Sequence, residues 1–247
     1  QISTDNIQTV EVIRGIPSAV YGDLTSGAVV VKTRSGVSPW QIRLKADPRL
    51  KQVYAGKGFS LGSDKGVVNV DADYALSYAD VRTPADVYRR VNLRIGYSQT
   101  AKKNLTYNTR LRLIYSDADN RTDPDNFLDN ISRDRDMGIG LDISGTYRLN
   151  KKWITNVEFM AAGDVTSQYS REKTYRSQGR VPQSLAMSSG ENLGFFTPYR
   201  YYSNLEVFGL PVNLQARVVA NLYGKYDEIT NKVLAGMEWT SRGNRGA

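Results

Sequence analysis

The chain has 247 residues, a formal net charge of +8, and neither cysteine nor histidine. These two absences exclude disulfide frameworks, thiolate nucleophiles, the Ser-His-Asp triad and the usual transition-metal ligands. Since no spacing of carboxylates, lysines or tyrosines points to another catalytic set, we expect no enzyme, no cofactor and no resident metal. The basic residues are scattered singly, without a recognition helix or lysine-rich arm, so we also expect no nucleic-acid partner.

The first expected elements are two short strands around a turn-rich centre. Thr9–Arg14 is the first strand, and Gly27–Arg34, with its β-branched run Val29–Val31, is the second. Gly15, Pro17 and Gly22 lie between them, and these residue types set turns.

This block resembles the last part of the plug domain of TonB-dependent outer-membrane transporters. The shared features are a strand ending in Arg14-Gly15, a Ser-Ala-Val-Tyr-Gly segment at 18–22, a loop that closes at Gly27, and a strand leading into a barrel. The form of 21–27, Tyr-Gly-Asp-Leu-Thr-Ser-Gly, is most similar to transporters of Bacteroidetes.

The resemblance implies that residues 1–36 are the C-terminal end of a plug domain and that 37–247 begin a transmembrane barrel. It implies a structural or gating role for the plug motif Arg14, Gly15, Tyr21, Gly22 and Gly27. In the family, the arginine pairs with glutamates of the barrel wall. The alternative is that Arg14 is a solvated residue at a turn.

After Gly36 the sequence changes to long segments in which apolar and polar residues alternate. In one segment, for example, Ile139, Leu141 and Ile143 alternate with polar residues. Such segments exceed an ordinary strand of about five or six residues and suit a tilted membrane crossing, although a soluble β-sandwich also alternates. We expect nine strands: Pro39–Ala46, Leu50–Ser60, Val67–Ala79, Tyr88–Ser98, Leu105–Ser116, Met137–Leu149, Trp153–Ser167, Val212–Tyr223 and Lys232–Ser241.

The connections favour the membrane barrel, because such barrels have short turns on the periplasmic side and longer outer loops. With the first strand rising outward, the inner turns are Gly62–Lys65, Thr100–Asn104, Asn150–Lys152 and Lys225–Thr230. The outer connections are Asp47–Arg49, Asp80–Arg89, Asp117–Asp136 and Gln168–Asn204, and the last three become progressively longer.

Two of these outer connections contain candidate binding residues. Asp117–Asp136 contains seven aspartates, which indicates either a calcium site or a solvated, mobile loop. Gln168–Asn204 begins basic and ends aromatic, a combination that can hold a sugar ring, an aromatic chelator or an anion. The candidate ligand contacts are Arg176, Arg180, Phe195, Phe196, Tyr199 and Tyr201. The alternative is that the aromatic end is the extramembrane top of the eighth strand and the basic end contacts lipopolysaccharide phosphates.

The predicted fold is therefore all-β: a partial antiparallel transmembrane barrel, about nine strands of the roughly 22 that the resemblance implies, preceded by the end of a plug. The implied function is TonB-dependent, energy-coupled uptake of a scarce nutrient (siderophore-iron, cobalamin, glycan or peptide) across the outer membrane. The implied partners are the TonB complex, through a segment outside this chain, outer-membrane lipid and lipopolysaccharide, the nutrient, and a surface lipoprotein. The alternative is a passive outer-membrane channel or an adhesin-type barrel.

Overall fold

In the computed structural model, the described part of the chain consists of strands, turns and loops, which confirms the all-β prediction. The described residues are 7–13, 28–33, 36–62, 65–102, 104–123, 125–151, 153–177, 182–196, 200–226 and 229–246. Among them, no helix is long and apolar enough to cross a membrane.

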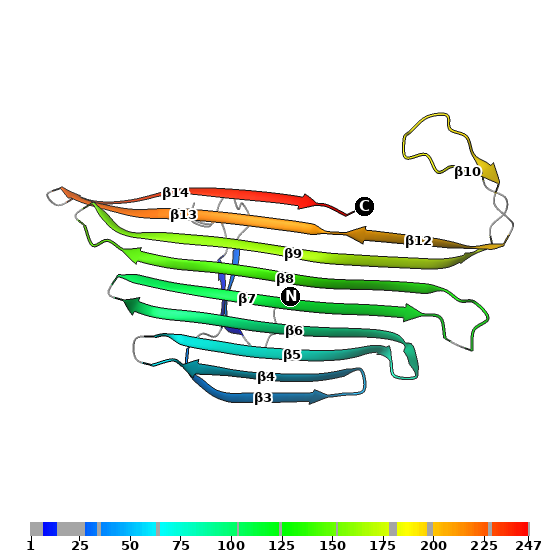
Figure 1. The fold of residues 1–247 in the computed structure, drawn as a ribbon, viewed down its shortest axis with the longest axis horizontal. Helices are drawn as coiled ribbons and strands as arrows, with labels where there is room; N and C mark the ends of the chain where they lie inside the picture. Colours follow the sequence, from blue (N-terminus) through cyan, green and yellow to red (C-terminus); the bar gives the residue numbers. More distant parts are fainter. Residues whose placement is uncertain are drawn as a thin grey trace.

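A ten-stranded antiparallel sheet contains most of these residues (Figure 1). Its order is β14-β13-β9-β8-β7-β6-β5-β4-β3, and β12 also pairs with β9. From β3 to β9, and from β13 to β14, consecutive strands are neighbours, and β3 and β14 lie at the two edges of the sheet. The bounds are β3 Ser38–Ala46, β4 Leu50–Ser60, β5 Val67–Asp80, β6 Thr83–Lys102, β7 Leu105–Arg121, β8 Ile131–Arg148, β9 Ile154–Arg176, β12 Tyr201–Gly209, β13 Pro211–Tyr226 and β14 Ile229–Asn244.

Two strands share the same edge of β9. β13 pairs with its first half, from Ile154 to Val165, and β12 pairs with its second half, from Gln168 to Arg176. The break between them falls at Leu210–Pro211, where proline has no N–H to donate to a ladder. β12 and β13 thus lie end to end along the same edge of β9.

A separate two-stranded sheet precedes the large one. β1 (Ile7–Ile13) and β2 (Ala28–Thr33) pair antiparallel, with Val10 opposite Val31. Figure 1 shows this hairpin behind the large sheet, on the side away from the viewer. The plug-motif residues Arg14, Gly15, Tyr21, Gly22 and Gly27, which come between these strands in the sequence, lie outside the described residues.

All nine predicted strands are present, but most extend further than predicted at one end. That end, called the loop end, holds the β3–β4, β5–β6, β7–β8 and β9–β12 connections; the opposite end is the short-turn end. The predicted loop Asp80–Arg89 is wrong, because β5 and β6 continue until only Val81 and Arg82 connect them. The predicted loop Asp117–Asp136 shrinks to 122–130.

The last predicted loop, Gln168–Asn204, is also shorter. β9 runs on to Arg176, and β12, which no predicted strand covered, begins at Tyr201. Between them lie the short strands β10 (Pro182–Gln183) and β11 (Phe195–Phe196), which pair with each other. Long connections at the loop end are therefore limited to 122–130 and 177–200.

Candidate functional site

The two faces of the large sheet differ in an unusual way: the apolar face is the more exposed one. On β8, Ile139 and Leu141 are 51% and 45% exposed, whereas the intervening Gly140 is buried and Asp142 is half-buried. On β5, the carboxyl side chain of Asp73 is only 3% exposed, while its neighbour Tyr74 is 42% exposed. A sheet with one water-facing side normally buries its apolar face instead.

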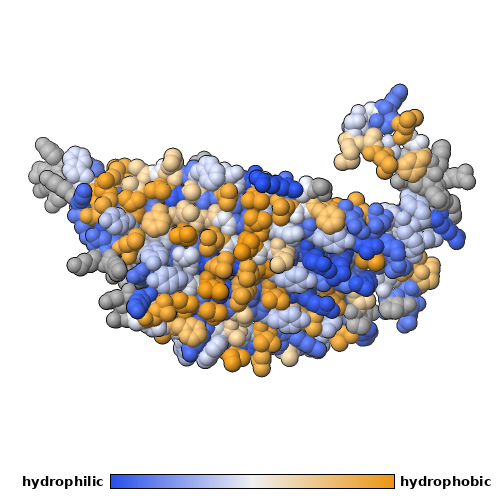
Figure 2. Space-filling view, viewed as in Figure 1, coloured by the Kyte–Doolittle hydropathy of each residue, from blue (hydrophilic) through white to orange (hydrophobic). Residues whose placement is uncertain are grey.

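Aliphatic side chains form continuous rows across the middle of the apolar face. One row contains six residues that are cross-strand neighbours on β5, β6, β7, β8, β9 and β13: Ala72, Leu93, Leu113, Ile139, Val165 and Val212. The next row contains Val70, Ile95, Leu111, Leu141 and Leu214, with Gly163 between the last two, beside the Leu214 side chain. Figure 2 shows the resulting hydrophobic band across the centre of the sheet.

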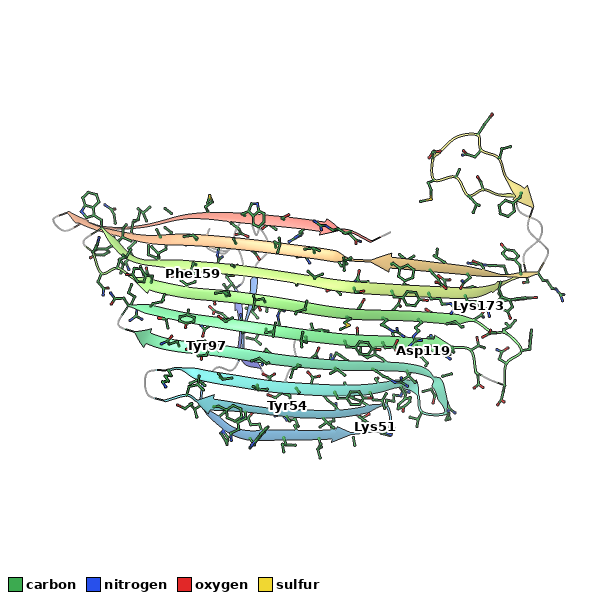
Figure 3. All side chains as sticks on the ribbon, in the orientation of Figure 1. Lys51, Tyr54, Tyr97, Asp119, Phe159 and Lys173 are labelled. Carbon is green, nitrogen blue, oxygen red and sulfur yellow. The ribbon has the colours of Figure 1, made fainter. Side chains whose placement is uncertain are left out.

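Aromatic residues border this band on both sides. Toward the short-turn end lie Tyr97 and Tyr107, whose ring centroids are 5.7 Å apart, together with Trp40, Tyr147 and Phe159. Toward the loop end, Tyr74 and Tyr115 flank Val91 in one row. Figure 3 shows Tyr97 and Phe159 near the short-turn end of their strands.

The height of the bordered band matches a bilayer. From Leu105 to Tyr115, β7 advances ten residues, paired with Tyr147 to Met137 on β8. At about 3.4 Å per residue this is about 34 Å along the strand, or about 26 Å along the membrane normal at a tilt of about 40°. Lipid-facing bands of outer-membrane barrels are about 25 Å tall and have aromatic girdles at both borders.

Charge pairs between neighbouring strands are the main feature of the opposite, polar face. Arg94 on β6 donates from Nε and Nη2 to the carboxylate of Asp71 on β5, each at 3.0 Å. Arg90 Nη2 lies 3.3 Å from Asp73, and Arg112 Nη2 donates to Asp142 at 3.2 Å. These mid-strand charges share one face of the sheet, and each pair bridges two adjacent strands.

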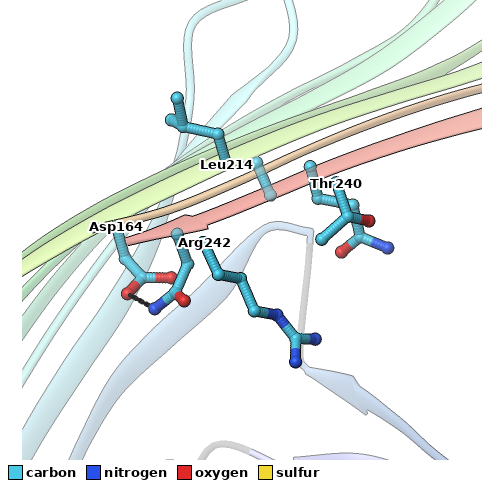
Figure 4. A pocket seen from close by; sticks show the side chains of 7 residues that line it. Asp164, Leu214, Thr240 and Arg242 are labelled. Atoms are coloured by element: carbon cyan, nitrogen blue, oxygen red, sulfur yellow. Dashed lines mark hydrogen bonds between the residues drawn. The ribbon is translucent and has the colours of Figure 1, made fainter. Parts of the chain in front are cut away.

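An open concavity of about 400 Å³ lies on the polar face near the β14 edge (Figure 4). Asn213 Nδ2 donates to Asp164 Oδ2 at 2.9 Å, and Gln215 and Thr240 lie in the next row. In Figure 4, Asp164, Thr240 and Arg242 point to one side of the strands and Leu214 points to the other. The polar face therefore continues to the edge of the sheet with both signs of charge.

A second charged group lies on the apolar face itself, one row beyond Tyr74 and Tyr115 toward the loop end. Arg133 on β8 donates from Nε and Nη2 to Asp117 on β7 at 2.9 and 3.1 Å. Arg121 donates to Asp119 at 2.8 Å. This charged band consists of Lys51, Arg89, Asp117, Asp119, Arg121, Arg133, Arg135, Arg171 and Glu206.

The 122–130 connection is fastened to the neighbouring strands. The backbone N–H of Tyr175 donates to Asn130 Oδ1 at 2.7 Å, and the N–H of Asp129 donates to the Tyr202 hydroxyl at 3.1 Å. Lys173 bonds to the Asp129 carboxylate and lies 4.7 Å from the centroid of the Tyr202 ring. These contacts oppose the reading of this segment as a mobile loop.

The alternative calcium site in this region has no support in the geometry. Asp117 and Asp119 lie within β7 and are engaged by arginines, while Asp134 and Asp136 lie within β8. Among the described residues, no group of three or more carboxylates is placed to hold a metal ion.

The structure brings only some of the candidate ligand contacts together. Arg176 and Tyr201 are cross-strand neighbours on β9 and β12, and Phe195 lies in β11 with half of its surface exposed. Phe196 also belongs to β11, whereas Arg180 and Tyr199 lie outside the described residues. The aromatic end of the predicted loop is thus divided between two elements. Tyr201 and Tyr202 lie in β12, which continues the line of β13 toward the loop end, apart from the phenylalanines of β11.

No family model, curated protein or solved structure matches this chain. Its interpretation therefore depends on the residues and on the geometry described above.

Proposed function

We propose that this chain belongs to a TonB-dependent transporter and forms the end of its plug and part of its outer-membrane barrel wall. The observation that carries the membrane assignment is the exposed apolar face, with its aliphatic band and its aromatic borders. At the strand tilt usual for outer-membrane barrels, the bordered band would be about 26 Å tall. A polar opposite face with paired charges suits the lining of a water-filled or plugged lumen.

The plug assignment is supported by the chain order. The 7–36 block resembles the end of a plug, and a separate β1–β2 hairpin directly precedes the sheet. Figure 2 shows the apolar face in the orientation of Figure 1, so the hairpin behind the sheet lies on its polar side. A plug domain occupies that side of a transporter's wall.

Energy-coupled uptake differs from passive diffusion in its need for the membrane potential. Cells lacking the protein are compared with complemented cells for the uptake, over minutes, of labelled iron chelate, cobalamin, glycan or peptide, with and without a protonophore. We expect complementation to restore the uptake of one nutrient and the protonophore to abolish it. Uptake that persists in de-energised cells favours the alternative, a passive channel.

A further inference from the structure

The connection 122–130 between β7 and β8 reaches past the start of its own strand to bond with β9. β8 begins at Ile131, so Tyr175 of β9 lies beyond the β8–β9 pairs. The backbone N–H of Tyr175 still has an acceptor, because Asn130 Oδ1 takes this hydrogen bond at 2.7 Å. Asn130 is itself fixed: its N–H donates to the Thr122 hydroxyl and its carbonyl accepts from the Thr122 N–H, each at 3.0 Å.

Asp129, the preceding residue of the same connection, joins two further side chains. Its backbone N–H donates to the hydroxyl of Tyr202 on β12 at 3.1 Å, and its carboxylate bonds to the ammonium group of Lys173 on β9. Lys173 also lies 4.7 Å from the centroid of the Tyr202 ring. The ring centroids of Tyr175 and Tyr202 are 5.4 Å apart. Two adjacent residues of one connection therefore hold the ends of two strands.

These strand ends are the two stems of the long connection between β9 and β12. Tyr175 comes directly before Arg176, and Tyr202 comes directly after Tyr201. Arg176 and Tyr201 are cross-strand neighbours and belong to the candidate ligand contacts. Figure 3 shows Lys173 near the loop end of its strand. The two long connections of the loop end are thus joined at one point, beside two residues that are candidates for holding a ligand.

The contacts at this point are weak when taken one at a time. The Lys173 side chain is 24% exposed and that of Asp129 is 68% exposed. An ion pair with such access to water contributes little alone and is screened by salt. The ion pair, the two hydrogen bonds and the ring contacts share their residues, so weakening one of them should weaken the others.

We propose that Asp129 and Asn130 form a latch that closes on Lys173, Tyr175 and Tyr202, so that the two long connections open and close as one unit. The closed latch holds the stems of the β9–β12 connection, and with them the paired ligand candidates, in one position. This effect on a ligand rests on the proposed uptake function, whereas the latch itself depends only on the contacts between the two connections.

The test follows hydrogen exchange of the Asp129 and Tyr175 amides in the intact purified protein, resolved at single residues by mass spectrometry with electron-transfer fragmentation. Both amides should be protected in the unmodified protein, and exchange without protection would overturn the latch. Tyr202→Phe keeps the ring but removes the acceptor of the Asp129 amide. We expect this variant to speed the exchange of both amides about tenfold, because opening frees them together. Acceleration at Asp129 alone would show independent contacts and overturn the latch.

A second variant, Lys173→Met, removes the charge and leaves the acceptors of both amides in place. It should also speed the exchange of both. Salt at about 1 M, where the screening length falls to about 3 Å, should do the same in the unmodified protein but not in this variant. Acceleration by salt that is equal in the two proteins would remove the ion pair from the latch and overturn it.

The matched control is Arg121→Met, which breaks the 2.8 Å ion pair between Arg121 and Asp119 just before the same connection. It removes the same charge without touching the latch, so the exchange of the Asp129 and Tyr175 amides should not change. An acceleration equal to that of Lys173→Met would show a general loosening of the loop end and overturn the latch.

The uptake experiment separates this inference from the proposed function. Lys173→Met should raise the nutrient concentration needed for half-maximal uptake several-fold without changing the amount of protein in the membrane. Faster exchange with unchanged uptake would refute the role of the latch in ligand capture. Protected amides in a protein without energised uptake would refute the proposed function and leave the latch standing.

Discussion

At the scale of single residues, the polar face is held by charge pairs that water reaches only in part. The side chains of Arg94 and Asp71 are 14% and 13% exposed, and three hydrogen bonds join them across β5 and β6. Removing the arginine leaves a poorly hydrated carboxylate without its main cation. We expect Arg94→Ala to lower the free energy of unfolding by on the order of 2 kcal/mol, measured by urea titration in lipid vesicles.

Arg148→Ala is the control for this prediction, because Arg148 is an exposed arginine of β8 on the same face. We expect a change below about 0.5 kcal/mol, as for most surface substitutions. Equal losses for the two variants would show that the Arg94–Asp71 pair has no particular role.

The β5–β6 turn offers a pH-dependent readout at the same scale. The Arg82 side chain donates to Asp80 from Nε at 3.3 Å and from Nη2 at 2.9 Å, and this pairing lowers the pKa of Asp80 from 3.8 to about 2. Because the folded-state pKa is depressed, the pair's contribution is complete above about pH 4 and is lost as the pH falls toward 2. A carboxyl-carbon NMR titration of Arg82→Gln should show the pKa of Asp80 moving back up; an unchanged midpoint contradicts the assignment.

At the scale of one strand, β8 presents its two faces to two different environments. Leu141 lies in the middle of the aliphatic band, and Ser144 lies three residues along on the polar face. We expect Leu141→Arg to destabilise the folded state by about 2–4 kcal/mol, the cost of an arginine near the bilayer midplane. Ser144→Arg should cost much less. The measurement is urea unfolding of both variants in vesicles, and the reverse order would invert the assignment of the faces.

The strands also show where sequence reasoning succeeds and fails. The alternation of apolar and polar residues predicts the short-turn end of every strand to within a few residues. It does so because apolar residues recur at every second position there. It failed at the loop end, where apolar residues are replaced by Arg89, Asp117 and Arg135 on the same face. The hydrogen-bond ladder continues there because these charges pair across strands, which a single-strand pattern cannot reveal.

The candidate site shows the same limit. Alternation in the sequence puts Asp71 and Arg94 on the polar side of their own strands, but which charges pair depends on strand register. Except for Lys51 and Glu206, the charged band falls in segments that the sequence predicts as loops, because charge-rich segments with aspartate are usually loops. The sequence does contain a signal for a longer strand. Asp117, Asp119 and Arg121 follow Tyr115 at steps of two, so all four would lie on one face if the strand continued. β12 was missed because its partner, β9, lies across a long connection.

At the scale of the whole molecule, the two ends of the sheet should face opposite sides of the membrane. The natural chain has no cysteine, so single cysteines can be introduced as reporters. Ser188 is an exposed residue between β10 and β11, and Lys151 lies in the β8–β9 turn at the short-turn end. A membrane-impermeant maleimide should label Ser188→Cys on intact cells, but Lys151→Cys only after the outer membrane is permeabilised. Labelling of both on intact cells contradicts this topology.

The pairing of charges on the polar face has a consequence for what can pass along it. Asp71, Asp73 and Asp142 each have an arginine within about one hydrogen-bond length, so each pair acts at a distance as a small dipole. Such fields fade within roughly the 8 Å screening length of physiological salt. A permeating solute would therefore feel these three pairs only weakly, whereas exposed charges of the same face, such as Arg148 and Arg242, would act on it by sign. Discrimination among solutes would then depend on shape, on those exposed charges and on the long connections at the loop end.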